Sequence, residues 1–368
     1  MSMDIDTICM SSGGIKGIAF VGALDYLNNE KLIDILKINN WVGTSVGSIL
    51  SLLFLIGYTP AEIGDFIIDF NFTKMNLDIS VENVFTKYGI NNGERFEFVI
   101  KSFLKNKLGV EDINFYNLYQ ITKKNLIIIG TNFSKSCEEA FSWDRTPDMS
   151  VITAIRISSS VPIFFTPVLY NGCYYVDGGI KNIFPINYCN EKTTLGLCIK
   201  YSNHNNHVES ISNIATGCLN IVTNTIGSMN TNIIFNENIM QIDNCVDEFI
   251  KFELSIEMKL QIIKSGQICA QQFINEYPVK ICKDILNKVI KNIENDLIIK
   301  NTVREQSTQT EDDLIIKNTV REQSTQTEDD LIIKNTVQEQ SSQSEDDLII
   351  KNTVQEQSSQ TEDDLIIK

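Results

Sequence analysis

The sequence predicts an α/β fold with a mostly parallel central sheet. Two observations favour this class. Short apolar stretches typical of strands alternate with helical patterns over roughly the first 290 residues, and two of these strands run into glycine-bearing turns that open directly into helices. In such folds functional residues gather at the carboxyl ends of the strands, so the turns after the strands are the first places to search for a site.

The elements follow in order along the chain. Asp6–Ser12 is expected to form a strand, and after the Gly13-Gly14 turn residues 15–31 carry the apolar spacing of a helix. A second strand is predicted near Ile35–Val42, followed by a helix over residues 46–58. Further helices are predicted over Pro60–Asp69, Glu94–Phe103 and Ile256–Asn275, and further strands over Asn125–Gly130, Tyr174–Val176 and Thr194–Lys200.

Composition limits the classes of function. The chain has 368 residues, of which 43% are hydrophobic and 21% charged, and a net charge of −16, which is typical of a globular protein and argues against a nucleic-acid partner. A membrane surface remains open as a partner, because lipid contact can be apolar and local. The apolar stretch SILSLLFLIGY is about half the roughly 20 residues that a membrane-spanning helix needs.

The cysteines indicate a reducing compartment. The nine cysteines are scattered, odd in number and never spaced as C-x-x-C. Together with the lack of a recognisable signal peptide, this predicts a cytoplasmic protein, which can lie peripherally at membranes or lipid droplets. Cysteines within apolar runs, such as Cys198 in LGLCIKY, are expected to be packing residues.

The C-terminal end is a tandem repeat. The unit LIIKNTVREQSTQTEDD starts at Leu297 and recurs with a period of 17 residues, ending in a remnant LIIK at Leu365. Sixteen acidic and seven basic residues give residues 297–368 a charge of −9. Because 17 residues at about 100° each displace the apolar patch by about 100° per copy, no coiled-coil seam forms. A disordered acidic tail is favoured over an ordered assembly, and its protein partner is unknown.

The segment GTSVG places Ser45 between Gly43 and Gly47, after a predicted strand and before a predicted helix. This is the pattern of a nucleophile elbow, a tight turn that exposes a serine oxygen and leaves no room for a side chain at either glycine. A nucleophilic serine needs a proton acceptor. The only histidines, His204 and His207, lie in the polar run SNHNNH, which is typical of a surface loop.

Two further motifs stand at strand ends. In SSGGIKG, residues 11–17, the amides of Gly13 and Gly14 at a helix start can bind an anion such as an oxyanion, and Lys16 adds positive charge. The same turn also suits a dinucleotide, although Asp34 precedes the second strand instead of ending it, or a purely structural role. The run YYVDGG places Asp177 at a strand end, where a plain β-turn is the alternative.

Taken together, GGIKG at residues 13–17, GTSVG at residues 43–47 and DGG at residues 177–179 resemble the patatin-like phospholipases. The run TPDMSVITAIRISSSVPIFFTPV, residues 146–168, also resembles the segment that precedes the aspartate motif in that family. The resemblance covers about residues 7–200, and Ser12 stands where a glycine is often found. It implies a three-layer α/β/α fold.

The resemblance implies a Ser–Asp dyad without histidine. Ser45 would be the nucleophile and Asp177 the proton acceptor, with partial burial raising the basicity of the carboxylate. The oxyanion hole would lie at Gly13, Gly14, Ile15, Lys16 and Gly17, and the motif glycines would be Gly43, Gly47, Gly178 and Gly179. The implied enzyme is a serine carboxylic-ester hydrolase acting on phospholipids or other acyl glycerols, with no metal and no cofactor.

Three domains are expected from these observations: a catalytic core over residues 7–200, a helical C-terminal part of that domain over residues 201–296, and the repeats over residues 297–368. An acyl channel would be formed by some of Leu50, Leu52, Leu53, Phe54, Phe164, Phe165 and Val168, although most of the helix residues among them suit the core. The alternative functions are a catalytically weak lipid-binding or scaffold protein whose tail recruits a partner, and a nucleotide-dependent oxidoreductase.

Overall fold

The fold is described from a computed structural model, which covers residues 3–74, 81–200, 238–243 and 253–276, together with residues 217, 221 and 225. All of these residues belong to one compact unit, Met1–Asp284. The tandem repeats over residues 297–368, both histidines and most of residues 201–296 lie outside the described residues.

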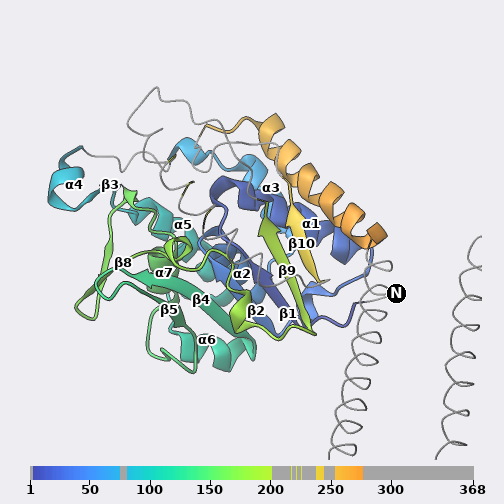
Figure 1. The fold of residues 1–368 in the computed structure, drawn as a ribbon, viewed down its shortest axis with the longest axis horizontal. Coiled ribbons are helices and arrows are strands. Elements are labelled where there is room, and N and C mark those ends of the chain that lie inside the picture. Colours follow the sequence, from blue (N-terminus) through green and yellow to red (C-terminus); the bar gives the residue numbers. More distant parts are fainter. Residues whose placement is uncertain are drawn as a thin grey trace, which may run out of the picture. The chain divides into compact units, whose positions relative to one another are not determined.

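A mixed sheet with mostly parallel strands forms the centre of the molecule (Figure 1). Five parallel strands lie in the order β10, β9, β1, β2, β4. Strands β5 and β8 each pair antiparallel with β4, and β7 pairs antiparallel with β8 at the end of the sheet. The strand bounds are β1 Thr7–Met10, β2 Asn40–Thr44, β4 Asn125–Asn132, β5 Cys137–Phe141, β7 Val168–Tyr170, β8 Cys173–Asp177, β9 Thr194–Ile199 and β10 Ile239–Ile242. The predicted α/β fold class is therefore confirmed.

Helices flank the sheet (Figure 1). Their bounds are α1 Ile18–Asn29, α2 Val46–Leu55, α3 Pro60–Asp69, α4 Val81–Thr86, α5 Glu94–Leu108, α6 Phe115–Thr122 and α7 Val151–Ser158, and a further helix covers residues 256–276. This last helix crosses α1 at close range, because a Cβ on Gly22 would lie 1.9 Å from the carbonyl oxygen of Ile263. No helix among the described residues is long and apolar enough to cross a membrane.

Alternation along the strands divides the core. Larger side chains such as Met10, Trp41 and Leu197 belong to the main cluster with α1, α2 and α7. A second, smaller cluster lies on the opposite face of the sheet, because it contains the strand residues next to those named above. Its members are Cys9, Val42, Ile183, Phe184, Ile186 and Cys198. Both faces of the parallel strands are therefore buried, as is usual when crossover connections cover a sheet.

The second predicted strand starts later than expected. Asp34 accepts a hydrogen bond from the N–H of Leu36 at 3.1 Å and caps a 3₁₀ turn over Ile35–Lys37, so strand geometry begins only at Asn40. The helix predicted over Glu94–Phe103 also runs further, to Leu108, where Gly109 ends it with a φ of 75°.

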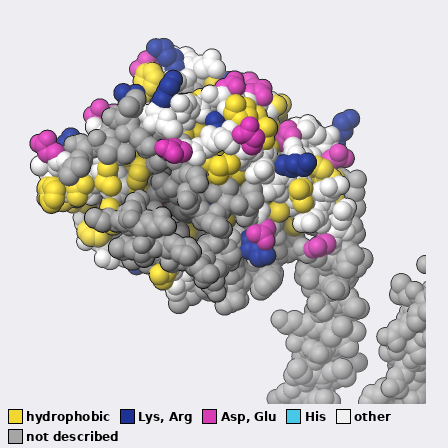
Figure 2. Space-filling model, turned by 90° about the horizontal axis from the view of Figure 1, so that it is seen from above, with side chains coloured by type: hydrophobic (Ala, Val, Ile, Leu, Met, Phe, Trp, Pro, Cys, Tyr) yellow, Lys and Arg dark blue, Asp and Glu magenta, His cyan; other side chains and the backbone are white. Residues whose placement is uncertain are grey.

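Apolar side chains are exposed beside a small second sheet. Strand β3 (Gly89–Asn91) pairs in parallel with β6 (Ile163–Phe165), and Phe85 on α4, Tyr88 and Ile163 are 79%, 68% and 50% exposed. Figure 2 shows hydrophobic side chains gathered at the left end of the molecule, the end where Figure 1 places α4. We refer to these three residues as the apolar rim.

Candidate active site

Ser45 lies in the tight turn between β2 and α2. Its φ of 54° and ψ of −123° are strained for a residue with a side chain, as expected for a nucleophile elbow. A Cβ on Gly47 would lie 2.4 Å from the carbonyl oxygen of Met10, and one on Gly43 would lie 2.4 Å from the carbonyl carbon of Gly47. Both glycines therefore allow the close approach of helix and strands that the turn requires.

Hydroxyl groups of neighbouring serines hold the elbow. The N–H of Ser45 donates to Oγ of Ser158 at 2.8 Å, and the hydroxyl of Ser48 donates to the carbonyl oxygen of Ser45 at 2.6 Å. Ser158 is the last residue of α7, so this helix end fixes the backbone of Ser45 from outside the elbow itself.

The topology brings Asp177 to Ser45 across 132 positions of sequence. Strand β5 occupies one edge of β4 over its last five residues, so β2 and β8 both pair with the other edge. They run toward each other along it: the last residue of β2, Thr44, pairs with Ile129, and the last residue of β8, Asp177, pairs with Gly130. The carboxyl ends of the two strands therefore meet at adjacent positions of β4.

The glycine after Asp177 makes this meeting possible. A Cβ on Gly178 would lie 2.2 Å from the carbonyl oxygen of Ile129 and 3.0 Å from Cγ2 of Thr44. The backbone of Asp177 is fixed on both sides, because its N–H donates to the carbonyl oxygen of Ser160 at 2.8 Å and its carbonyl oxygen accepts from the hydroxyl of Thr131 at 2.9 Å.

The carboxyl group of Asp177 is buried, with the residue only 4% exposed. Oδ1 accepts from the N–H of Gly179 at 2.7 Å, whereas Oδ2 has no hydrogen-bond partner of standard geometry among the described residues. Burial raises the pKa of Asp177 to about 7, and the Gly179 N–H and the Ser45 hydroxyl oppose the rise without cancelling it. No hydrogen bond of standard geometry joins the side chains of Ser45 and Asp177. Hydrogen bonds between catalytic groups often shorten only when the substrate binds.

The glycine-rich turn also lies beside Ser45. Gly14, with a φ of 53°, and Ile15 line the same cavity as Ser45, and a Cβ on Gly17 would lie 2.5 Å from Cγ1 of Val46. The N–H of Lys16 is already used, since it donates to the carbonyl oxygen of Gly13 at 3.1 Å. The side chain of Lys16 is buried, and Lys16 is not among the described residues that line the cavity.

An apolar cavity of about 230 Å³ opens at Ser45. Helices α2, α3 and α5 and strand β6 supply most of its wall, including Leu50, Leu53, Phe164 and Phe165 among the residues considered for an acyl channel. Leu52 and Phe54 are fully buried core residues instead, and Val168 packs against the main core cluster outside the cavity. The sequence did not identify the contributions of Phe66, Phe70, Phe72, Phe96 and Phe103.

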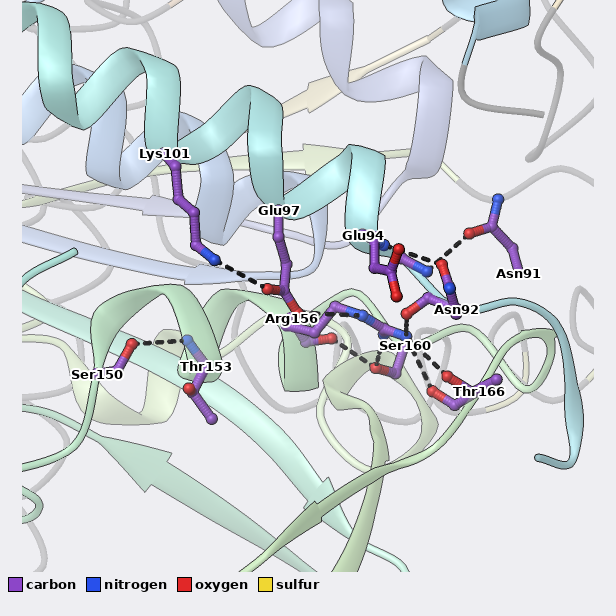
Figure 3. Close-up of polar contacts among 11 residues, drawn as sticks. Asn91, Asn92, Glu94, Glu97, Lys101, Ser150, Thr153, Arg156, Ser160 and Thr166 are labelled. Atoms are coloured by element: carbon purple, nitrogen blue, oxygen red, sulfur yellow. Dashed lines mark hydrogen bonds and ion pairs between the residues drawn. The ribbon is translucent and has the colours of Figure 1, made fainter. Parts of the chain in front are cut away.

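A buried arginine beside the site was also missed. Arg156 on α7 is 4% exposed, and Figure 3 shows its guanidinium between Glu97 of α5 and the side chains of Ser160 and Thr166. Desolvation by burial lowers the pKa of Arg156 to about 10, against the opposing charge of Glu97, so the group stays protonated at neutral pH. The sequence did contain an indication of this residue, because Arg156 is the one charged residue in the apolar run VITAIRIS. A buried arginine is almost always paired, so its position suggested a specific contact.

The dinucleotide alternative finds no support in the position of Asp34. This residue caps the turn before β2, at the amino end of the strand, whereas the glycine turn follows the carboxyl end of β1, which runs parallel to β2. Asp34 and the glycine turn therefore lie at opposite ends of neighbouring parallel strands, so they cannot bind one dinucleotide as the corresponding residues of a dinucleotide-binding fold do. Within the part of the chain that the structure describes, no group of three or more metal-binding side chains is found.

The chain is similar to known proteins over the part that holds the candidate site. The family model of the patatin-like phospholipases matches residues 8–189. The probable lipid hydrolase 463L of Invertebrate iridescent virus 6 is 32% identical over 206 residues, which cover 55% of this chain and 67% of the viral protein. The uncharacterized protein R571 of Acanthamoeba polyphaga mimivirus is also 32% identical, over 203 residues that cover 55% and 67% of the two chains.

Among solved structures, VipD from Legionella pneumophila has the same fold, with a TM-score of 0.53 at 15% identity over 74% of this chain and 67% of VipD. A mostly parallel sheet flanked by helices, with a strand-to-helix serine turn, places the protein in the α/β class. The chain belongs to the patatin-like phospholipase family. Family membership supports a lipid hydrolase activity.

Proposed function

We propose that this protein is a lipid acyl hydrolase of the phospholipase A or lysophospholipase type, which cleaves fatty acyl esters with Ser45 as nucleophile and Asp177 as proton acceptor. The observation that carries the proposal is the meeting of the ends of β2 and β8 on one edge of β4, next to an apolar cavity. All the proposed groups fall within residues 7–200, which we assign as the catalytic core.

In the first step Oγ of Ser45 attacks the acyl carbonyl carbon, and Oδ2 of Asp177 takes the hydroxyl proton. The tetrahedral intermediate then collapses, the ester C–O bond breaks, and the proton passes from Asp177 to the leaving alcohol. In the second step water attacks the acyl-enzyme while Asp177 accepts its proton. Return of that proton to Ser45 releases the fatty acid and restores both groups.

The environment of Asp177 suits this role. A carboxylate with an ordinary pKa near 4 is a weak base at neutral pH, whereas a pKa of about 7 lies where a general base works best. The unpartnered Oδ2 leaves one lone-pair position open for the proton of Ser45. Burial therefore supplies the basicity that a histidine supplies in other serine hydrolases.

Backbone amides of the glycine-rich turn are the proposed oxyanion donors. Gly14 and Ile15 line the cavity beside Ser45, whereas the amide of Lys16 is engaged with Gly13. The positive end of α2, which begins directly after Ser45, points at the same developing charge. We therefore narrow the predicted hole to Gly14 and Ile15 and give Gly13 and Gly17 roles in shaping the turn.

The experiment that tests the proposal combines labelling and turnover. The wild type should react covalently with a fluorophosphonate probe at Ser45 and release fatty acid from phosphatidylcholine or a short-chain ester, and Ser45→Ala should do neither. The control is Ser51→Ala on the same helix, a buried serine whose side chain lies outside the cavity lining. Lipid binding without labelling or turnover in the wild type would favour the scaffold alternative.

The apolar rim suits contact with a lipid surface. Its residue Ile163 directly precedes Phe164 and Phe165, which line the cavity, so a bilayer held by the rim would lie beside the cavity wall. A lipid acyl chain could then move from the bilayer into the cavity without crossing water.

The rim therefore predicts a difference between substrates. Phe85→Ser combined with Tyr88→Ser should lower hydrolysis of phosphatidylcholine vesicles by about tenfold or more, because two side chains no longer enter the bilayer. Hydrolysis of a soluble butyrate ester should stay within about twofold. Leu36→Ser combined with Ile121→Ser is the matched control, since both residues are 61% exposed and lie on other elements. Equal losses on vesicles and on the soluble ester would contradict the role of the rim.

A further inference from the structure

The side chain of Arg156 forms hydrogen bonds with three segments of the chain and so holds them together. Its Nη1 donates to Oγ of Ser160, and its Nη2 donates to the carbonyl oxygen of Asn92 at 3.0 Å and to both oxygens of Thr166 at 3.1 Å (Figure 3). Asn92 precedes α5, and Thr166 follows β6. One planar guanidinium thus connects α7, the start of α5 and the end of β6.

Two of these parts are walls of the acyl cavity. Phe96 of α5 and Phe165 of β6 both line it, and their rings contact each other with centroids 5.8 Å apart. The guanidinium carbon of Arg156 lies 4.9 Å from the centre of the Phe165 ring, a cation–π contact. The backbone at Gly93 packs directly against the guanidinium of Arg156, because a Cβ on Gly93 would lie 2.2 Å from Nε.

The third part leads to the dyad. Ser160, which accepts from Arg156 and donates back to its carbonyl oxygen, is also the residue whose own carbonyl oxygen accepts from the N–H of Asp177. Ser158, two residues earlier on the same segment, accepts from the N–H of Ser45. The segment held by Arg156 is therefore the one that fixes the backbones of both proposed catalytic residues.

We propose that Arg156 is a positioning residue that sets the wall of the acyl cavity relative to Ser45 and Asp177, and so determines which acyl chain lengths are cleaved. The inference rests on the proposed function of the site. According to this proposal, the function of Arg156 depends on the fixed arrangement of its guanidinium N–H donors and not on its positive charge alone. A lysine ammonium is a point charge that cannot reach Ser160, Asn92 and Thr166 at fixed angles.

Replacement of Arg156 by lysine tests the proposal. Active sites are first counted by fluorophosphonate titration, and kcat and KM per active site are then measured for p-nitrophenyl butyrate and decanoate. We expect Arg156→Lys to raise KM for the decanoate and to lower the preference for decanoate over butyrate by about tenfold, because a displaced wall acts on the longer chain. A shift of Ser45 or Asp177 would lower kcat for both esters and leave that preference unchanged. A purely structural role would lower the number of active sites and leave the preference unchanged.

A second variant covers the case in which Arg156→Lys does not fold. Ser160→Ala removes one hydroxyl, keeps the carbonyl oxygen that binds Asp177, and should shift the chain-length preference in the same direction. Lys105→Ala is the control, since this exposed lysine lies on the same helix as Glu97 and pairs with Glu111. An unchanged preference per active site in every variant that folds would overturn the inference. A wild type that neither labels nor hydrolyses would instead overturn the proposed function.

Discussion

Asp177→Asn is expected to lower kcat for ester hydrolysis by about 10³- to 10⁴-fold, because the amide cannot accept the proton of Ser45. The change keeps the shape of the side chain and leaves an oxygen that can accept from Gly179, so the turn should persist. The kcat is measured on a short-chain ester with saturating substrate. As a control, Asp148→Asn changes an exposed carboxylate and should stay within about twofold. Activity of Asp177→Asn above a tenth of the wild type would rule out the dyad.

The pH dependence follows from the same carboxyl group. Because Asp177 must be ionised to accept a proton, kcat/KM of the wild type should rise with pH through an apparent pKa of about 7 and level off above it. A profile that is already flat from pH 5 upward would mean that Asp177 titrates normally and is not the base.

The stability of the protein should respond in the opposite direction. Since the pKa of Asp177 is raised on folding, the native state binds more protons than the unfolded chain between about pH 4 and pH 7, and the free energy of unfolding falls as pH rises through that window. The shift from 3.8 to about 7 corresponds to a loss of up to about 4 kcal/mol. Asp177→Asn should therefore gain stability relative to the wild type at pH 8 and little at pH 4, as urea unfolding can show.

The sequence could identify Ser45 and Asp177 as candidates but could not bring them together. Each motif is local: the glycines around Ser45 and after Asp177 mark sharp turns at strand ends. Their meeting depends on strand pairing, in which β5 takes one edge of β4 and leaves the other to be shared by β2 and β8. Such pairing depends on contacts between segments that are distant in sequence. In addition, β8 pairs antiparallel with β4, whereas the alternation of strands and helices in the sequence predicts parallel neighbours.

Two residues show why side-chain roles were harder to predict. Lys16 was expected to add charge at the oxyanion hole because it adjoins the glycines. Within the 3₁₀ turn Gly14–Gly17, however, its side chain is buried and does not line the cavity. Arg156 belongs to α7, a helix that the sequence did not predict because seven of its eight residues are buried and no polar face marks the period. The buried charge of Arg156 points to a function of this helix, and the spacing of apolar residues in the sequence gives no such information.

Gly47→Ala tests the elbow itself and should destabilise the protein by about 3 kcal/mol. The added Cβ would lie 2.4 Å and 2.7 Å from the carbonyl oxygens of Met10 and Ser11, and backbone atoms of a central strand cannot rotate away as a side chain can. Helix α2 must therefore move relative to β1, carrying Ser45 with it. We expect kcat to fall by about 100-fold even in the fraction that stays folded.

The matched control is Gly64→Ala in α3, a second helical glycine, where nothing lies within 4 Å of the added Cβ. It should raise the free energy of unfolding by about 0.5 to 1 kcal/mol, because alanine loses less backbone entropy in a helix than glycine does. Urea unfolding followed by the fluorescence of the two tryptophans measures both variants. If the two alanines had the same effect, Gly47 would be an ordinary helical glycine, and the close contact of α2 with β1 would not be what holds Ser45 in its strained turn.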